Sequence, residues 1–505
     1  MSNEPKIQRV HIELQRVQTW LFAVPRLRAM VGANALLGET LRVELPKLAR
    51  QTGRWVLAPS TEVYPEACES DPLKQHDDPA ADAKDGILAR DGGHFEAQFG
   101  SGASAFADAA AQLLRNSMPG LRFRISIDSA RLAKSQVHLS TELPVLAPCE
   151  WTGRGLASEI VEQGDERPAV SLDVAHRHEA AKRAEDGSAV DLASLLVETT
   201  QLKKLRRPRE LKELVGNGYL ALIHADGNGV GSGAGKTDSE RARFFHRNRV
   251  LLRCAVQNAM DAHCPDKEQA PLIPLMLGGD DLLLVCRAEI ALPFVVTLCD
   301  ALASLQIDDD SFKLTLGVGV VIAKHTIPIH RLHEVAEQLA SSAKRRYRGL
   351  KDGGEEGRSV VDWAVYSTAW VDDPEEVRRR DWLRGNGNDS RVLSQRPVDV
   401  LGQGLDSLQG LVRGAGKLTR APRSQLRYLA DQLPRGRALS ELAFAELSKE
   451  ARDALEEAGV NEPWRHTANN GAWLTALLDL VEIAEIARFG RSVEDTRAET
   501  EAVHV

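Results

Sequence analysis

Two stretches decide the fold, Tyr-Leu-Ala-Leu-Ile-His-Ala-Asp-Gly-Asn at residues 219–228 and Leu-Gly-Gly-Asp-Asp-Leu at residues 277–282. The first is an apolar run of strand length that ends at Asp226, which is the pattern of a buried strand. The second lies between two further apolar runs and carries the turn-forming residues of a β-hairpin. Whether Asp226 lies close to the two acidic residues of the hairpin depends on the order of the strands and helices around them.

The surrounding segments predict a ferredoxin-like sheet with additions. Apolar periodicity gives the order β-α-β-β-α-β-α-β. In such a sheet the first strand and the central hairpin are neighbours, so Asp226, Asp280 and Asp281 are expected to converge at one sheet edge. Helices are expected at 239–263, 292–305 and 332–347, and strands at 219–225, 272–277, 282–286, 312–323 and 360–366.

Three converging carboxylates favour a divalent-metal site for nucleotidyl transfer. Such transfer needs positioned metal ions rather than covalent help from the protein, and Mg²⁺ prefers one or two carboxylates with substrate phosphates and water. Without a cation, the carboxylates would repel one another. We therefore predict Asp226, Asp280 and Asp281 as catalytic residues and as ligands of Mg²⁺ or Mn²⁺. The alternative is an ordinary surface turn, since Gly-Gly-Asp-Asp is also common hairpin chemistry.

Five residues near these acids are predicted to bind the nucleotide. Gly278 and Gly279 permit positive φ and a close approach of the backbone to a ligand. Gly227 and Asn228 directly follow Asp226. Lys344, near the end of the last long helix, is expected to reach triphosphate oxygens. Its alternative role is that of a lysine favourably placed at a helix C-terminus.

The glycine-rich segment at 229–237 resembles a P-loop without its spacing. The motif Gly-x4-Gly-Lys-Thr requires glycine at position 230, where the chain has Val230. We therefore interpret this segment as a flexible loop over the nucleotide.

Composition indicates a globular, cytoplasmic protein. The chain has 505 residues, of which 43% are hydrophobic and 27% charged, which suggests two to four domains with a sizeable core. A net charge of −8 argues against binding of nucleic acid over the whole surface. The six cysteines form no CxxC pair and fit a reducing cytoplasm. No signal peptide is expected, and no apolar stretch reaches the roughly 18–20 residues that span a bilayer.

Four regions follow from these patterns. Residues 1–145 are expected to form a small α/β unit, in which 66–91 is a solvated loop rich in Asp, Lys, Ala and Pro. Residues 146–210 are predicted to be a charged, largely helical linker domain. The sheet with the acidic residues occupies 211–370, and 371–505 is expected to be helical.

Region 211–370 resembles the catalytic palm shared by diguanylate cyclases and the large subunit of type III CRISPR effector complexes. The turn at 278–281 matches the variant used by the CRISPR polymerase family. The strand and turn at 314–320 and 327–330 resemble those of the CRISPR family, and the helix with Ala336, Ala343 and Lys344 resembles both groups. Two further segments favour the CRISPR branch: 26–37 is similar to the start of that family's first palm, and 396–397 with 422–426 resemble its last helical domain.

The resemblance implies an α+β chain with two ferredoxin-like palm domains, the first of them degenerate. Gly92-Gly93-His94-Phe95 resembles the 278–281 turn with both acids gone, and Gln15 stands near where Asp226 would fall. The nuclease domain that often begins family members is expected to be missing, so His76-Asp77 is interpreted as a coincidence. Cys149 has no nearby partner cysteine, and the zinc site often found between the palms is expected to be lost.

For function, the resemblance implies synthesis of cyclic oligoadenylate from ATP in antiviral defence, with two ATP molecules meeting between the palms. The expected partners are other type III effector subunits with guide RNA and target RNA, or a second copy of the chain if it works without them.

Two other functions stay open. A diguanylate-cyclase-like dinucleotide cyclase is one, although residues 270–277 lack the inhibitory Arg-x-x-Asp motif often found in that class. A catalytically silent scaffold subunit is the other, and the retention of all three acids speaks against it.

Overall fold

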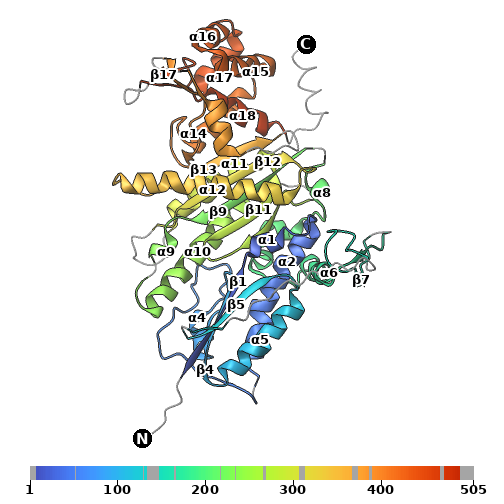
Figure 1. Cartoon of the computed structure of the whole chain (residues 1–505). Coiled ribbons are helices and arrows are strands. Elements are labelled where there is room, and N and C mark those ends of the chain that lie inside the picture. The colour runs from blue at the N-terminus through green and yellow to red at the C-terminus, as the bar shows by residue number, and fades with distance from the viewer. Residues whose placement is uncertain are drawn as a thin grey trace. The chain divides into compact units, whose positions relative to one another are not determined.

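The computed structural model describes residues 7–51, 53–128, 130–132, 147–163, 166–216, 218–233, 235–264, 269–305, 313–366, 373–385, 389–466 and 471–489. These residues form two large sheets with their helices, a helical segment between them in sequence, and a mostly helical C-terminal part (Figure 1). The predicted α+β class is therefore confirmed.

The first sheet has the strand order β2-β4-β1-β5-β6, with β3 paired to β4. All of these neighbours are antiparallel. Taken along the chain, the four strands β1, β2, β4 and β5 lie in the order second-third-first-fourth, which is the ferredoxin-like arrangement. The strands are β1 (Gln8–Gln15), β2 (Val56–Leu57), β3 (Ile87–Ala89), β4 (His94–Ser101), β5 (Arg122–Ile127) and β6 (Ala130–Leu132).

Alternation along β1 and β4 places the core of this region. Val10, Ile12 and Leu14 are buried on one face of β1, as expected where one face of a strand packs on a core. Phe106 of a helix packs against the Phe95 and Phe99 rings of β4. The helices are α1 (Val17–Leu21), α2 (Leu27–Glu39), η1 (Thr40–Glu44), α3 (Leu45–Ala49), α4 (Pro79–Lys84) and α5 (Ala103–Ser117).

The second sheet repeats this order and extends it, as β10-β11-β9-β12-β13-β16. Its first four strands again lie as second-third-first-fourth, so the internal repeat expected from the sequence is present in the topology. β12 pairs antiparallel with β9 and parallel with β13. The strands are β9 (Tyr219–Gly227), β10 (Leu272–Leu277), β11 (Asp281–Arg287), β12 (Leu316–Lys324), β13 (Val360–Tyr366) and β16 (Val398–Asp399).

The helices of the second sheet begin and end near the predicted positions. α10 starts at a capping box, in which the Thr237 side chain accepts from the Glu240 N–H and the Glu240 side chain accepts from the Thr237 N–H. α12 packs against β12, β13 and β9. The helices are α8 (Leu211–Val215), α9 (Val230–Gly233), α10 (Asp238–Ala262), α11 (Ala288–Ser304) and α12 (Ile329–Asp352).

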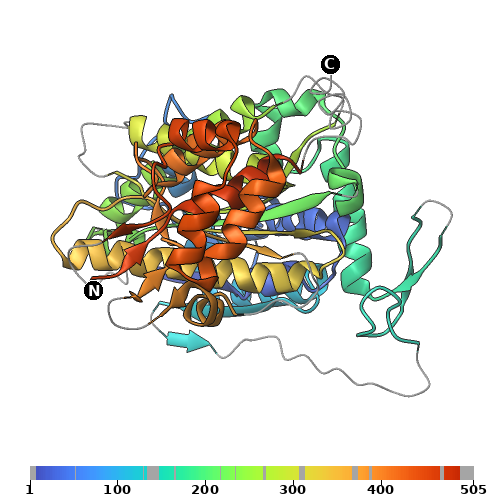
Figure 2. The same ribbon diagram turned by 90° about the horizontal axis from the view of Figure 1, so that it is seen from above.

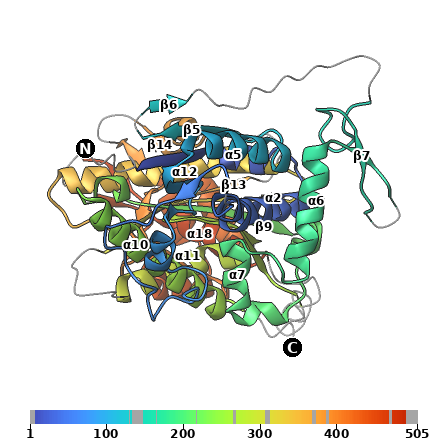
Figure 3. The same ribbon diagram turned by 90° about the horizontal axis from the view of Figure 1, so that it is seen from below.

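The segment between the two sheets is mainly helical, as predicted. Helices α2 and α6 lie side by side (Figure 3), and they approach closely because Gly32 has no Cβ, which would lie 1.8 Å from the Arg177 carbonyl oxygen. Cys149 is buried in a small apolar cluster with Val24 and Val174. The elements are β7 (Glu159–Ile160), β8 (Ala169–Val170), α6 (Leu172–Glu185), α7 (Leu192–Glu198) and η2 (Gln201–Lys204).

The C-terminal part contains the predicted helices, which lie together in Figure 2, and also a small sheet that was not predicted. This sheet has the order β14-β15-β18-β17. Each of its strands is two residues long, too short to leave a period-two pattern in the sequence. The elements are α13 (Pro374–Val377), η3 (Arg378–Trp382), β14 (Leu383–Arg384), β15 (Arg391–Val392), α14 (Leu408–Leu418), α15 (Arg423–Gln432), η5 (Leu433–Arg435), α16 (Arg437–Ala445), α17 (Lys449–Glu457), β17 (Arg465–His466), β18 (Trp473–Leu474) and α18 (Leu477–Ala487).

None of the helices in the described ranges has both the length and the apolar composition needed to cross a membrane.

Candidate functional site

Three carboxylates gather at the end of strand β9 and on the turn that joins β10 to β11. One oxygen atom from each of Asp226, Asp280 and Asp281 lies within 4.8 Å of the others. β9 and β11 are neighbours in one hydrogen-bonded sheet, which is why residues more than fifty positions apart meet. All three side chains are partly exposed. Among the described residues this is the one group of three or more possible metal ligands.

The residue of strand β12 that pairs with Asp226 is a glycine. Gly317 pairs with Asp226, and Gly319 pairs with His224, two residues earlier on β9. A Cβ on Gly317 would lie 2.6 Å from Lys344 Cγ, and a Cβ on Gly319 would lie 2.1 Å from the Ala336 carbonyl oxygen. The two glycines therefore let helix α12 approach the sheet, and the space at Gly317 lets the Lys344 side chain cross to Asp226.

Lys344 forms an ion pair with Asp226 through its Nζ atom and Asp226 Oδ2. Both side chains are about one-third exposed, at 29% and 33%, so solvent and ligands can reach them. The sequence predicts Lys344 near the phosphates, and the structure brings it to the acidic group. Its ammonium group can neutralise part of the negative charge there and can exchange the carboxylate for a phosphate oxygen.

Gly227 ends β9 and Asn228 directly follows it, beside the acids. The Asn228 backbone N–H donates to the Thr315 carbonyl oxygen at 2.8 Å, and its side-chain Nδ2 donates to Thr315 Oγ1 at 3.3 Å. Asn228 is only 3% exposed. In this structure it ties the end of β9 to the segment before β12, and its predicted contact with a nucleotide stays a prediction.

The hairpin turn does not use the positive φ that its two glycines permit. Gly278 and Gly279 do not have positive φ, whereas Gly92 and Gly93 at the matching turn of the first sheet do. The turn is closed by a hydrogen bond from the Gly278 N–H to the Asp281 carbonyl oxygen, 2.8 Å long. What these two glycines offer at this turn is the absence of a side chain, and their predicted contact with the nucleotide stays a prediction.

The segment after β9 is not a P-loop, in agreement with its spacing. Val230–Gly233 is a short helix, and the N–H groups of Lys236 and Thr237 both donate to Glu240 Oε2, at 2.9 and 3.0 Å. A P-loop would aim such N–H groups at phosphate. Here they cap helix α10.

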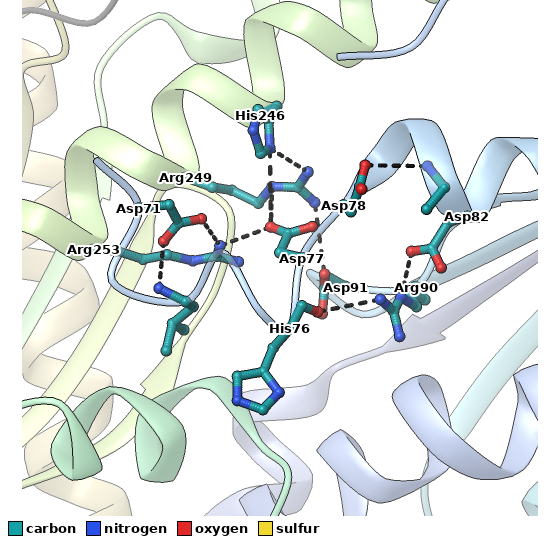
Figure 4. A network of polar contacts seen from close by, with 12 residues as sticks. Asp71, His76, Asp77, Asp78, Asp82, Arg90, Asp91, His246, Arg249 and Arg253 are labelled. Atoms are coloured by element: carbon teal, nitrogen blue, oxygen red, sulfur yellow. Dashed lines mark hydrogen bonds and ion pairs between the residues drawn. The ribbon is translucent and has the colours of Figure 1, made fainter. Parts of the chain in front are cut away.

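A buried network of charged side chains joins α10 to the segment 66–91 (Figure 4). Arg253 is fully buried, and its Nη1 atom donates to Asp71 Oδ2 and Asp77 Oδ2, each at 2.7 Å. The predicted solvated loop was wrong for these acids, which are each 3% exposed. Because the partners are 176 and 182 residues apart, local composition does not reveal the pairing.

The network keeps its charges. Burial alone would raise the pKa of Asp77, but Arg249, Arg253 and His246 outweigh it and hold the pKa well below the ordinary value. For Arg253, burial alone would lower the pKa. The negative charges of Asp77 and Asp71 outweigh burial and hold the pKa of Arg253 above its usual value. His76, the neighbour of Asp77, is exposed, whereas Asp77 is buried.

The first sheet carries polar side chains where the second has acids. Gln15 ends β1, and its Nε2 atom donates to Glu13 Oε2 at 3.3 Å. His94, after the Gly92-Gly93 turn, stacks on His11 with ring centroids 5.3 Å apart. The turn of the first sheet thus carries no acid at the positions that match Asp280 and Asp281, and its assignment as a degenerate palm stays a prediction.

Residues 219–352 match the sequence model of a family described as Cas10/Cmr2, second palm domain. This segment is therefore similar in sequence to the second palm domain of Cas10/Cmr2 proteins. The match covers β9 through α12, and so includes the three acids, the turn and Lys344. The expected relation to the large palm-domain subunit of type III CRISPR effector complexes is confirmed. No curated protein matches the chain in sequence.

Solved Csm1 structures are similar to the chain over much of its length. Csm1 in T.onnurineus is 12% identical, over 97% of this chain and 70% of its own, with a TM-score of 0.45. A Csm1-Csm4 cassette in complex with cA4 is 12% identical over 96% and 70%, with a TM-score of 0.44. A cassette in complex with AMPPNP is 14% identical over 68% of this chain and 54% of that chain, with a TM-score of 0.41. The palm assignment rests on the Cas10/Cmr2 sequence match.

Proposed function

We propose that Asp226, Asp280 and Asp281 hold Mg²⁺ or Mn²⁺ and that the chain joins ATP molecules into a cyclic oligoadenylate. The observation that carries this proposal is the meeting of three carboxylate oxygens within 4.8 Å of one another, inside a segment that matches the Cas10/Cmr2 second palm. Hard oxygen donors in such a group fit Mg²⁺ and Mn²⁺.

When bound, the cation would neutralise phosphate charge and lower the pKa of a ribose hydroxyl. That hydroxyl oxygen attacks the α-phosphorus of a second ATP. A new P–O bond forms, the bond to the β-phosphate oxygen breaks, the hydroxyl proton passes to solvent, and pyrophosphate leaves. Repeating this step within one linear product closes the ring.

The chain's own contribution is positioning and charge. Asp280 and Asp281 lie on a short hairpin between two buried strands, which limits how far their carboxylates can move. Lys344, paired with Asp226, is placed to pass from that carboxylate to a phosphate oxygen as the nucleotide enters. Preorganised charge of this kind supplies the largest share of rate enhancement in many enzymes.

We place this activity in antiviral defence, in a type III CRISPR setting. The relation to the large palm-domain subunit supports assembly with other effector subunits, guide RNA and target RNA in the cytoplasm. A net charge of −8 fits nucleic-acid contacts that are local or made through those subunits.

Removal of both turn acids tests the proposal. The double variant Asp280→Ala, Asp281→Ala should lose synthesis from labelled ATP, because the cation loses two of its three carboxylates. Its thermal unfolding should stay close to that of the wild type, since both side chains are partly exposed. The assay runs with Mn²⁺ or Mg²⁺, on the chain alone and with any effector subunits and target RNA that co-purify, and identifies the product by mass.

The matched control is the double variant Asp300→Ala, Glu334→Ala, which removes two exposed acids from helices α11 and α12 and should keep full synthesis. Full synthesis by the turn variant would refute the site. A cyclic product from GTP in place of ATP would favour the diguanylate-cyclase-like alternative.

A further inference from the structure

Arg249 of helix α10 lies against the turn that carries Asp280 and Asp281. Its Cγ atom is 3.9 Å from where a Cβ on Gly279 would stand. Its side chain is 16% exposed, so one edge of it remains open to solvent. The extended rest of an arginine side chain reaches about 4 Å beyond Cγ, by standard bond lengths, which brings the surroundings of Asp280 within range of the guanidinium.

The guanidinium group of Arg249 is loosely held. It lies 3.7 Å from Asp77 Oδ2 through Nε, 3.6 Å from Asp91 Oδ2 through Nη1, and 3.4 Å from His246 Nδ1 through Nη2 (Figure 4). These distances exceed those of good hydrogen bonds to charged groups, which are about 2.7–2.9 Å. Its Nε atom is buried without a hydrogen-bond partner among the described residues. An arginine offers five N–H donors, and toward the described residues those of Arg249 make only the long contacts given above.

The two carboxylates beside Arg249 already have closer partners. Asp77 accepts from Arg253 at 2.7 Å, and Asp91 accepts from Arg42 at 2.7 Å. Release of Arg249 would therefore leave neither acid unpaired. Where a buried carboxylate has no second cationic partner, moving its arginine away would leave an unpaired buried charge, which strongly destabilises the fold.

We propose that Arg249 is a phosphate-binding residue, and that its guanidinium turns from Asp77 and Asp91 to the triphosphate of a nucleotide bound at the Asp280–Asp281 turn. This assignment rests on the proposed function. A planar guanidinium fork matches phosphate oxygens in pairs. Asp226, Asp280 and Asp281 are negatively charged and would repel a triphosphate, so its binding needs positive groups in addition to the metal. Arg249 supplies one positive group on the side of the turn where α10 lies.

The proposal predicts opposite changes in metal binding and nucleotide binding. Arg249 repels a cation near the acids but attracts a triphosphate. Its removal should therefore leave Mn²⁺ affinity unchanged or raise it, while it weakens nucleotide binding. A residue that merely shapes the turn would lower both affinities together, because the displaced acids would lose the metal and the nucleotide with it.

The test compares Arg249→Gln, Arg249→Lys and the control Arg243→Gln, all in the full chain. Arg243 is exposed on the same helix, so its replacement removes an equal charge away from the turn. Mn²⁺ affinity is measured by electron paramagnetic resonance, and affinity for AMPPNP with Mn²⁺ by calorimetry. Arg249→Gln should weaken AMPPNP binding about tenfold, the loss of roughly one charge-assisted contact. Arg249→Lys should recover part of this, and Arg243→Gln should match the wild type.

Two results would overturn the assignment while the proposed function stands: unchanged AMPPNP affinity in Arg249→Gln, or a parallel fall in Mn²⁺ affinity. Thermal unfolding of the variants checks that they are folded at the temperature of measurement. If the wild-type chain binds neither Mn²⁺ nor AMPPNP, the proposed function itself fails, and the role of Arg249 fails with it.

Discussion

At the scale of single residues, Gly317 shows how an absent side chain can serve the site. It pairs with Asp226 across the sheet and leaves the room through which Lys344 reaches that acid. A Cβ there would also approach Asn228 Oδ1 to 3.1 Å. Since Lys344 is long and flexible, it can yield to an added methyl group, but only by leaving its position against Asp226.

We therefore expect Gly317→Ala to raise the KM for ATP, by up to roughly tenfold if one charge-assisted contact to phosphate is lost. Stability should also fall, by about 1–3 kcal/mol, because the clash is with Lys344 Cγ close to the α12 backbone and the buried Asn228 lies beside it. The control is Gly416→Ala on an open face of α14, which should stabilise the fold by about 0.5–1 kcal/mol without affecting synthesis. An unchanged KM in Gly317→Ala would show that Lys344 acts from another position.

The positions of some of these residues could be predicted from sequence patterns, and those of others could not. Asp226, Asp280 and Asp281 could be predicted to meet, because each stands at the end of a strong apolar strand pattern. Gly317 looks like any strand glycine until its neighbour on α12 is known. Arg253, Asp71 and Asp77 were beyond prediction, since a buried ion pair over more than 170 residues leaves no local periodic signal.

At the scale of elements, the contact between α12 and β9 buries two histidines near the acids. His333 of α12 and His224 of β9 lie with ring centroids 5.9 Å apart, and both are almost fully buried. Burial, aided by the neighbouring His224, lowers the pKa of His333 to about 3. Burial and the positive charge of Lys344 lower the pKa of His224 as well, against the opposing effect of Asp226.

This contact should make the fold sensitive to acid. The unfolded chain takes up a proton on His333 near pH 6.5 and the folded chain only near pH 3, so stability falls as the pH falls through that window. Between pH 7 and pH 5 the loss from His333 should be about 2 kcal/mol.

Denaturant unfolding at several pH values measures this loss. His333→Leu should show a flatter fall between pH 7 and pH 5 than the wild type. His330→Gln, exposed on the same helix, should keep the wild-type slope. Equal slopes for His333→Leu and the wild type would mean that His333 does not stay neutral in the folded chain.

At the scale of the whole molecule, the chain contains the same strand order twice. Both sheets could be predicted from the sequence. Their long strands show either alternating apolar and polar residues or a continuous apolar run, and their hairpin turns carry pairs of glycines. The small sheet in the C-terminal part could not, since its two-residue strands are held by neighbouring segments rather than by their own sequence. The repeat also shows what differs between the two sheets, with Gln15 and His94 in the first and three acids in the second.

The most direct test of the central claim is anomalous scattering from crystals of the full chain grown with Mn²⁺ and AMPPNP. We expect a manganese peak within bonding distance of carboxylate oxygens of Asp226, Asp280 and Asp281, with the triphosphate beside it. A structure with no manganese at this place, or with Asp226 remote from Asp280 and Asp281, would contradict the metal-dependent nucleotidyl-transfer site.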